Sequence, residues 1–270
     1  MITPRHVLVA VVAACATLGV VVAPARTDKK PVMGSAIFEW EAVAVKEQKT
    51  GARRQFFQAP TATLDELECH ATTLNPGESP HAPHRHVEEE IMVVKEGTVE
   101  ALAGGETRRA GPGSVIFQAS NQLHGLRNVG TTQATYHVFK WKTPGAPRAT
   151  SALRSAVFEW ESMKATTEKY GARRQLFQSQ TATLDELESH VTTLNPGETT
   201  GPPHRHPEEA LVIVKEGTVE ALTAGGEWRR VGPGSVVFEA SNQLHGLRNA
   251  GRTQAAYHVI KWHTPATPKK

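Results

Sequence analysis

The chain has 270 residues, of which 39% are hydrophobic and 21% charged, and its formal net charge is +3. That length is sufficient for two domains of ordinary size. The charge is close to balance, and basic residues stand in short pairs such as Arg53-Arg54 and Arg229-Arg230. Without a basic helix or stacked aromatic residues, the composition argues against a nucleic-acid-binding protein.

Residues 1–25 have the pattern of an export signal. Arg5 supplies positive charge, an apolar run extends from Val7 to Val22, and Ala23-Pro24-Ala25 is a small-x-small cleavage site. The run is shorter than the ~20 residues of a typical span, so we expect no stable membrane span. We predict a periplasmic or secreted protein. A lipoprotein attached through Cys15 is the less favoured alternative, because apolar residues continue after this cysteine.

The rest of the chain is a tandem duplication. Residues 35–40 (SAIFEW) return as residues 155–160 (SAVFEW), and His84-Arg85-His86 returns as His204-Arg205-His206, 120 positions later (204 − 84). One residue inserted at a Gly-Gly turn changes the offset to 121, as in His124 and His245 (245 − 124). We therefore predict two domains, the first copy at residues 35–143 and the second at 155–264.

The segments outside the two copies have the composition of connections. Residues 144–154 contain Pro, Gly and Ser and are predicted to be a linker. Residues 265–270 are a polar tail.

Short extended segments separated by turn signals dominate each copy. Turn signals such as Asn75-Pro76-Gly77 and Gly111-Pro112-Gly113 punctuate the first copy. Short strands at this spacing indicate a β-sandwich or barrel, so we predict an all-β protein. In the first copy the extended segments are residues 53–58, 64–74, 91–102, 114–117 and 134–141.

A two-part motif of glycines, histidines and a glutamate recurs in this frame. It resembles the cupin signature, and the match covers both copies. The departures, among them Ala119 and Asn121 where the signature usually has Pro and Gly, are expected to alter loop shape more than ligand chemistry. The resemblance implies two tandem jelly-roll-like β-barrels that pair within one chain, a bicupin. The motif residues of the first copy are Gly77, His84, His86, Glu90, Gly97, Gly113, His124 and Asn128.

The motif of the first copy predicts a metal site. Side chains alternate faces along a strand, so His84, His86 and Glu90 can point to one side while Arg85 points to the other. His124 is expected to join them from a later strand. Three imidazoles and one carboxylate suit a divalent transition metal such as Fe, Mn, Zn, Ni or Cu.

The second copy keeps His204, His206 and His245 but has Ala210 where the first copy has Glu90. The neighbouring Glu209 is expected on the opposite face of the strand unless a bulge reorients it. Two interpretations stay open. The second copy holds a weaker, neutral three-histidine metal site, or it is a structural partner domain.

Four further histidines lie in predicted strands: His70, His190, His137 and His258. Each is either an acid or base at the pocket or a half-buried histidine bonded to a backbone carbonyl, and we favour the second reading. Gln122 and Asn128 flank His124 and are expected to orient it. Phe56, Phe57, Phe117 and Phe139 are expected in the core. Cys69 is interpreted as a small strand residue, because Ser189 replaces it in the second copy.

Among cupins, the chain most resembles the quercetin-dioxygenase-like proteins. This resemblance implies an exported metal-dependent enzyme, dioxygenase-like, that acts on a small oxygenated molecule. Because one fold hosts many functions, a non-catalytic small-molecule-binding or structural bicupin stays an alternative.

Overall fold

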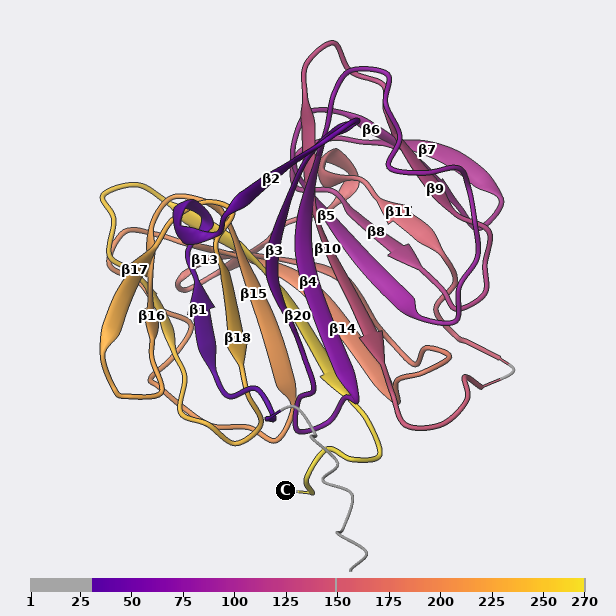
Figure 1. Cartoon of the computed structure of the whole chain (residues 1–270). Helices are drawn as coiled ribbons and strands as arrows, with labels where there is room; N and C mark the ends of the chain where they lie inside the picture. The colour runs from indigo at the N-terminus through magenta and orange to yellow at the C-terminus, as the bar shows by residue number, and fades with distance from the viewer. Residues whose placement is uncertain (1–30, 149, 270) are drawn as a thin grey trace, which may run out of the picture.

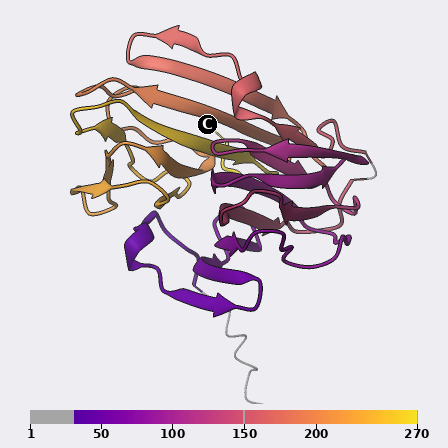
Figure 2. The same ribbon diagram turned by 90° about the horizontal axis from the view of Figure 1, so that it is seen from above.

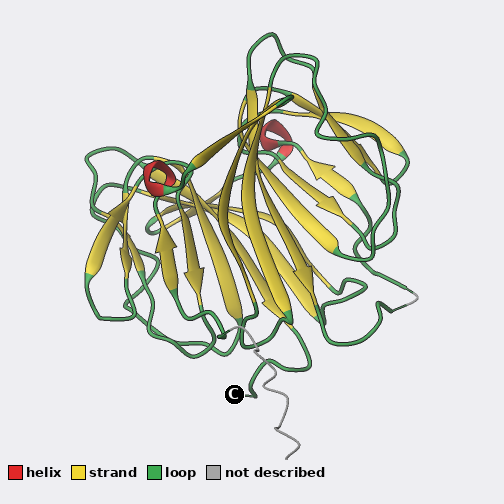
Figure 3. Cartoon of the chain, in the orientation of Figure 1, coloured by secondary structure: helices red, strands yellow, loops and turns green. Residues whose placement is uncertain are grey.

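The computed structural model describes residues 31–148 and 150–269. The predicted export signal lies outside the described residues. The described part is built almost entirely of strands, as expected, with two single-turn 3-10 helices, η1 (Trp40–Ala42) and η2 (Trp160–Ser162) (Figure 3). None of the helices in this part has the length and apolar character that a membrane crossing requires.

The strands form two large and two small antiparallel sheets, which lie in layers (Figures 1 and 2). The first large sheet has the order β11 (Ala156–Phe158), β8 (Val115–Gln118), β5 (Glu89–Glu96), β10 (Ala134–Lys142), β4 (Glu66–Leu74), β3 (Gly51–Ala59), β2 (Val45–Gln48). The second has the order β1 (Ala36–Phe38), β18 (Val236–Glu239), β15 (Glu209–Glu216), β20 (Ala255–His263), β14 (Glu186–Leu194), β13 (Gly171–Ser179), β12 (Thr166–Glu168). The small sheets are β7 (Glu106–Ala110), β6 (Val99–Ala103), β9 (Gly125–Asn128) and β17 (Trp228–Val231), β16 (Val219–Leu222), β19 (Leu247–Asn249).

The two copies exchange their first strands. Strand β1 of the first copy pairs with β18 of the second, with Ala36 opposite Phe238, and β11 pairs with β8, with Ala156 opposite Phe117. In Figure 1 the indigo β1 accordingly lies among the orange strands of the second copy. The sequence did not predict this exchange. Strands β1 and β11 have nearly the same sequence, so each would fit the sheet of either copy.

Side-chain alternation gives each large sheet two different apolar faces. We call the face toward the other large sheet the shared face, and Ile91, Phe117 and Phe139 lie in the core there. The opposite, inner face packs on a small sheet and carries Met92 and Tyr136. The shared core contains residues of both copies, so the copies are joined by apolar burial as well as by the exchanged strands.

The shared core also holds the four predicted aromatic residues, which is the core role expected of them. These residues are Phe56, Phe57, Phe117 and Phe139. Cys69 is fully buried there as a free thiol, consistent with its interpretation as a small strand residue.

One buried glutamate of each copy is hydrogen-bonded to the other copy. Glu209 is completely buried and accepts hydrogen bonds from the hydroxyls of Thr61 (2.6 Å) and Thr63 (2.5 Å) and from the Ala62 N–H (3.1 Å). The equivalent Glu89 accepts hydrogen bonds from residues 181–183 of the second copy. A buried charge is tolerated here because three donors replace water.

We predict that Glu209→Ala lowers the free energy of unfolding by about 3 kcal/mol or more, since it leaves the buried hydroxyls of Thr61 and Thr63 without this acceptor. Denaturant titration of the full chain measures the change. Glu216→Ala, at an exposed position of the same strand, serves as the control and should change stability by less than about 0.5 kcal/mol. Equal losses in the two variants would contradict the role assigned to Glu209.

Candidate metal centre

The histidines of the first copy are brought together by a loop and a single β-bridge. His84 and His124 exchange two backbone hydrogen bonds of 3.0 Å, while His86 lies in the loop before β5. The expectation that His84-Arg85-His86 forms a strand is therefore wrong. Pro83 has no N–H with which to extend the ladder before His84.

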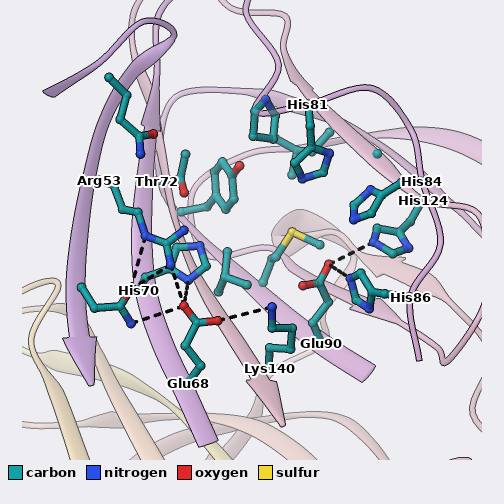
Figure 4. Close-up of a pocket in the computed structure, with 18 of the residues that line it drawn as sticks. Arg53, Glu68, His70, Thr72, His81, His84, His86, Glu90, His124 and Lys140 are labelled. Atoms are coloured by element: carbon teal, nitrogen blue, oxygen red, sulfur yellow. Dashed lines mark hydrogen bonds and ion pairs between the residues drawn. The ribbon is translucent and has the colours of Figure 1, made fainter. Parts of the chain in front are cut away.

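Glu90, the second residue of β5, points from the inner face toward this loop (Figure 4). The candidate ligand atoms of His84, His86 and His124 lie within 4.8 Å of one another. Glu90 Oε1 lies 3.3 Å from His124 Nε2 and 3.7 Å from His86 Nε2. Burial opposes ionisation of Glu90, but the adjacent His124 and His86 outweigh it and hold the pKa of this carboxyl well below its usual range. The three predicted histidines thus form one group, and the Glu90 carboxylate lies beside two of them.

Backbone carbonyls fix the orientation of two of these imidazoles. His124 Nδ1 bonds to the Gln122 carbonyl and His86 Nδ1 to the Glu88 carbonyl, both at 2.9 Å. A carbonyl only accepts, so each Nδ1 carries a proton, and each Nε2, which lies toward Glu90, is the nitrogen that can bind a metal once it is unprotonated. The Nε2 atom of His124 is buried and has no hydrogen-bond partner among the described residues. This donor set fits a divalent transition metal.

The loop beside the bridge accommodates the departures from the usual motif. Asn121 has a φ of 58°, in the left-handed region that Asn tolerates better than most residues, and its N–H donates to the His86 carbonyl at 2.8 Å. Gln122 orients His124 as expected, but through its backbone carbonyl. Asn128 does not: its side-chain amide donates to Leu74 and Thr132 and shapes a turn.

A cavity of about 500 Å³ opens beside the four ligands, between the inner face of the large sheet and the loop. A charged cluster lines it near the ligands (Figure 4). Glu68 is paired there with Arg53 (2.6 Å), His70 Nδ1 (3.0 Å) and Lys140 (3.5 Å). Burial raises the pKa of Glu68, but the bond to His70 and the charges of Lys140 and Arg53 prevail and lower this pKa to about 2. No sequence motif predicted that Arg53, Glu68 or Lys140 would lie at the site.

The strand histidines have different environments, and the favoured backbone-carbonyl bond is wrong for His258, whose two ring nitrogens are buried without a hydrogen-bond partner among the described residues. His70 lines the cavity and is bonded to the Glu68 carboxylate, not to a backbone carbonyl as we favoured. His137 is fully buried on the shared face and bonds to the Gly234 carbonyl of the second copy at 2.8 Å, as favoured. Burial lowers the pKa of His137 to about 4. His137 is therefore a structural residue, whereas His70 belongs to the cavity.

His81, which the second copy lacks, also lines the cavity. Its ring centroid lies 4.1 Å from that of His84, edge to face. It extends the imidazole cluster without being part of the three-histidine group.

The second copy repeats the bridge and the three-histidine group. His204, His206 and His245 offer atoms within 4.8 Å of one another, and His204 pairs with His245. Ala210 takes the place of Glu90, and Glu209 points away to the shared face, as strand alternation predicted.

A residue that the sequence analysis missed lies beside this group. Glu239 Oε2 is 3.9 Å from His245 Nε2, and burial raises the pKa of Glu239 to about 7. Its counterpart in the first copy is Gln118. Alignment of the copies at the offset of 121 shows this replacement of Gln by Glu, but it does not show that the residue lies beside Ala210.

Comparison with known proteins supports the resemblance. A family model described as a cupin domain matches residues 71–140 and 190–261. No curated protein matches the chain.

Solved two-domain structures match most of the chain at low sequence identity. YlbA from Escherichia coli is 13% identical, with a TM-score of 0.68, 90% of this chain covered and 97% of that chain. AerE from Microcystis aeruginosa is 16% identical, with a TM-score of 0.62, 83% of this chain and 98% of that one. Oxalate decarboxylase from Bacillus subtilis is 13% identical, with a TM-score of 0.64, 87% of this chain and 78% of that one. At such identities these structures show the fold alone.

We predict that the double substitution His84→Ala, His86→Ala removes one equivalent of divalent metal from the full chain, because two of the four converging ligands are lost. Elemental analysis after equilibration with metal and dialysis measures the content. His70→Gln, which alters the same cavity but not the ligand group, should retain the full content. Unchanged metal in the double variant would refute the assignment.

We predict that the ion pairs of Glu68 stabilise the fold above about pH 4.5 and lose this effect as the pH falls toward 2. The folded-state pKa lies below the ordinary value of 4.5, so protonation favours the unfolded chain. The effect should be on the order of 2 kcal/mol, with an allowance for solvent screening. Unfolding free energies of Glu68→Gln between pH 5 and 2 should therefore depend less on pH than those of the unmodified chain; parallel curves would exclude this contribution.

Proposed function

The chain belongs to the cupin domain family, and from that premise we propose that it is an exported, metal-dependent enzyme that acts on a small oxygenated anion in the first copy. One observation carries the proposal. A single cavity of about 500 Å³ is lined both by the His84, His86, His124 and Glu90 group and by the charged cluster around Glu68. A volume of this order suits a small molecule.

The four converging side chains would hold a divalent transition metal. Such an ion acts as a Lewis acid toward carbonyl, enolate or carboxylate oxygens and holds them in place. Glu90 lies beside His86 and His124 and would offset part of the ion's charge.

The charges around the cavity favour an anionic substrate. Arg53 and Lys140 are balanced by Glu68 and Glu90, so a divalent ion would leave the cavity with a net positive charge. A carboxylate or enolate would be attracted to such a site, more strongly than a neutral molecule.

His70 is the residue best placed to move a proton in this cavity. Because Nδ1 is bonded to the Glu68 carboxylate, Nε2 is the nitrogen left to accept a proton from a substrate. The carboxylate also stabilises the imidazolium that would form. We assign His70 the role of general base.

A dioxygenase-like reaction is the class we favour, because the family resemblance points to it and it needs only substrate, metal and dioxygen. A reaction with so few reactants suits a protein that is exported, as the signal predicted in residues 1–25 implies. The similarity in fold to an oxalate decarboxylase supports a second candidate, the decarboxylation of a small carboxylic acid.

Turnover by metal-loaded full-length protein tests the proposal. Flavonols, diketones and small mono- and dicarboxylic acids would be supplied in turn, with oxygen uptake and carbon dioxide release recorded. We predict that His70→Gln lowers turnover at least about 100-fold, whereas His190→Gln, the same change in the second copy, leaves it nearly unchanged. Binding of these anions without uptake, release or product would instead identify a binding protein, and equal losses in the two variants would contradict the role of His70.

A further inference from the structure

The second copy has a buried glutamate on the strand next to the position that corresponds to Glu90. In the first copy Glu90 of β5 lies opposite Gln118 of β8. In the second copy the corresponding pair is Ala210 of β15 and Glu239 of β18. Residues directly opposite each other in a sheet project from the same face, so Glu239 reaches the inner face from which Glu90 contacts its histidines.

Glu239 has no anchor other than the histidine group among the described residues. Gln118 donates its side-chain amide to the Leu102 carbonyl at 3.0 Å, a bond that a carboxylate is unable to make. Glu239 is only 6% exposed, and its one partner in the described part of the chain is His245, at 3.9 Å. A buried carboxylate in this position is unfavourable unless a cation is beside it.

The histidines of the second copy present their free nitrogens to the same point. Nδ1 of His204, His206 and His245 is bonded to the carbonyls of residues 202, 208 and 243, at 2.8 to 3.1 Å. Each Nε2 is therefore left with its lone pair. His245 is 4% exposed, and its Nε2 lacks a hydrogen-bond partner within residues 31–148 and 150–269.

The distance between Glu239 and His245 is compatible with a shared ion. Two ligands of one metal lie at most about 4.2 Å apart, twice the usual metal–ligand distance of about 2.1 Å. The 3.9 Å between Glu239 Oε2 and His245 Nε2 meets this limit. Glu239 lies this close to one histidine of its group, whereas Glu90 lies 3.3 and 3.7 Å from two histidines in the first copy.

We propose that the second copy binds its own divalent metal ion through His204, His206, His245 and Glu239. The chain then holds two ions with the same ligand types, in which the carboxylate comes from different strands. Such a site differs from both interpretations left open by Ala210, the neutral three-histidine site and the structural partner domain.

The surroundings of Glu239 distinguish this second site from the first. Glu239 and His245 line a cavity of about 260 Å³ together with Ser35 to Ile37 of the exchanged strand and Thr223 to Gly225 of the turn that carries the inserted residue. Glu239, the turn with the inserted residue and the exchanged strand therefore all line this cavity. The cavity offers a smaller ligand space than that of the first copy.

Zinc binding by the second site alone tests this assignment. The full chain with His84→Ala and His86→Ala serves as the parent, is stripped with a chelator, and is titrated with Zn²⁺ against a competing chromophoric chelator. The parent should bind one equivalent, and additional Glu239→Gln should weaken binding at least about tenfold. Gln118→Ala, the matching change in the first copy, should not alter the affinity.

A rescue variant tests whether Glu239 is a metal ligand or a structural residue. Adding Ala210→Glu to the Glu239→Gln variant restores a carboxylate from the strand position used by the first copy, and the affinity should recover by at least about tenfold. Thermal unfolding of the metal-free variants confirms that each is folded. A parent that binds no zinc, or a Glu239→Gln variant that binds as tightly as the parent, would overturn the proposal. Because the first site is disabled throughout, neither result bears on the function proposed for the first copy.

Discussion

Strand alternation at the start of β5 and β15 is the constraint on which both the assembly and the sites depend. In β5, Glu89 points to the shared face and accepts hydrogen bonds from the second copy, while Glu90 points inward to the histidines. In β15, Glu209 likewise accepts hydrogen bonds from the other copy, whereas Ala210 has no carboxylate that could contact the histidines. A shift of one residue in either strand would exchange the two faces and disrupt the interface and the site together.

This arrangement explains how the copies can diverge without loss of the fold. The hydrogen-bonded carboxylates Glu89 and Glu209, the shared apolar core and the exchanged strands hold the two copies together on one face of each large sheet. The inner faces do not join the two copies, so the residues on them can differ between the copies. Both copies have a charged cluster on this face, around Glu68 in the first and around Glu188 in the second, but the first has the larger cavity and the second has Glu239 beside its histidines.

The sequence predicted the parts of the structure that depend on local pattern. Turn signals and short extended segments indicated an all-β protein, and the repeated motif indicated the family and the three-histidine groups. The direction of Glu209 followed from alternation alone. These predictions succeeded because each rests on a few neighbouring residues.

The remaining features depend on which strands lie side by side, and a single sequence does not state this. The exchange of β1 and β11 leaves no local trace, because SAIFEW and SAVFEW would fit either sheet. The cluster of Arg53, Glu68 and Lys140 comes from three separate strands. Glu239 was missed for the same reason: its relation to Ala210 becomes visible only once β15 and β18 are paired.

Anomalous diffraction from crystals of the zinc-loaded full chain, recorded above and below the zinc absorption edge, would locate the bound ions. We predict two anomalous peaks, one in contact with His84, His86, His124 and Glu90 and one in contact with His204, His206, His245 and Glu239. Peaks located elsewhere, or the lack of any peak within the histidine groups of a fully loaded protein, would contradict this prediction.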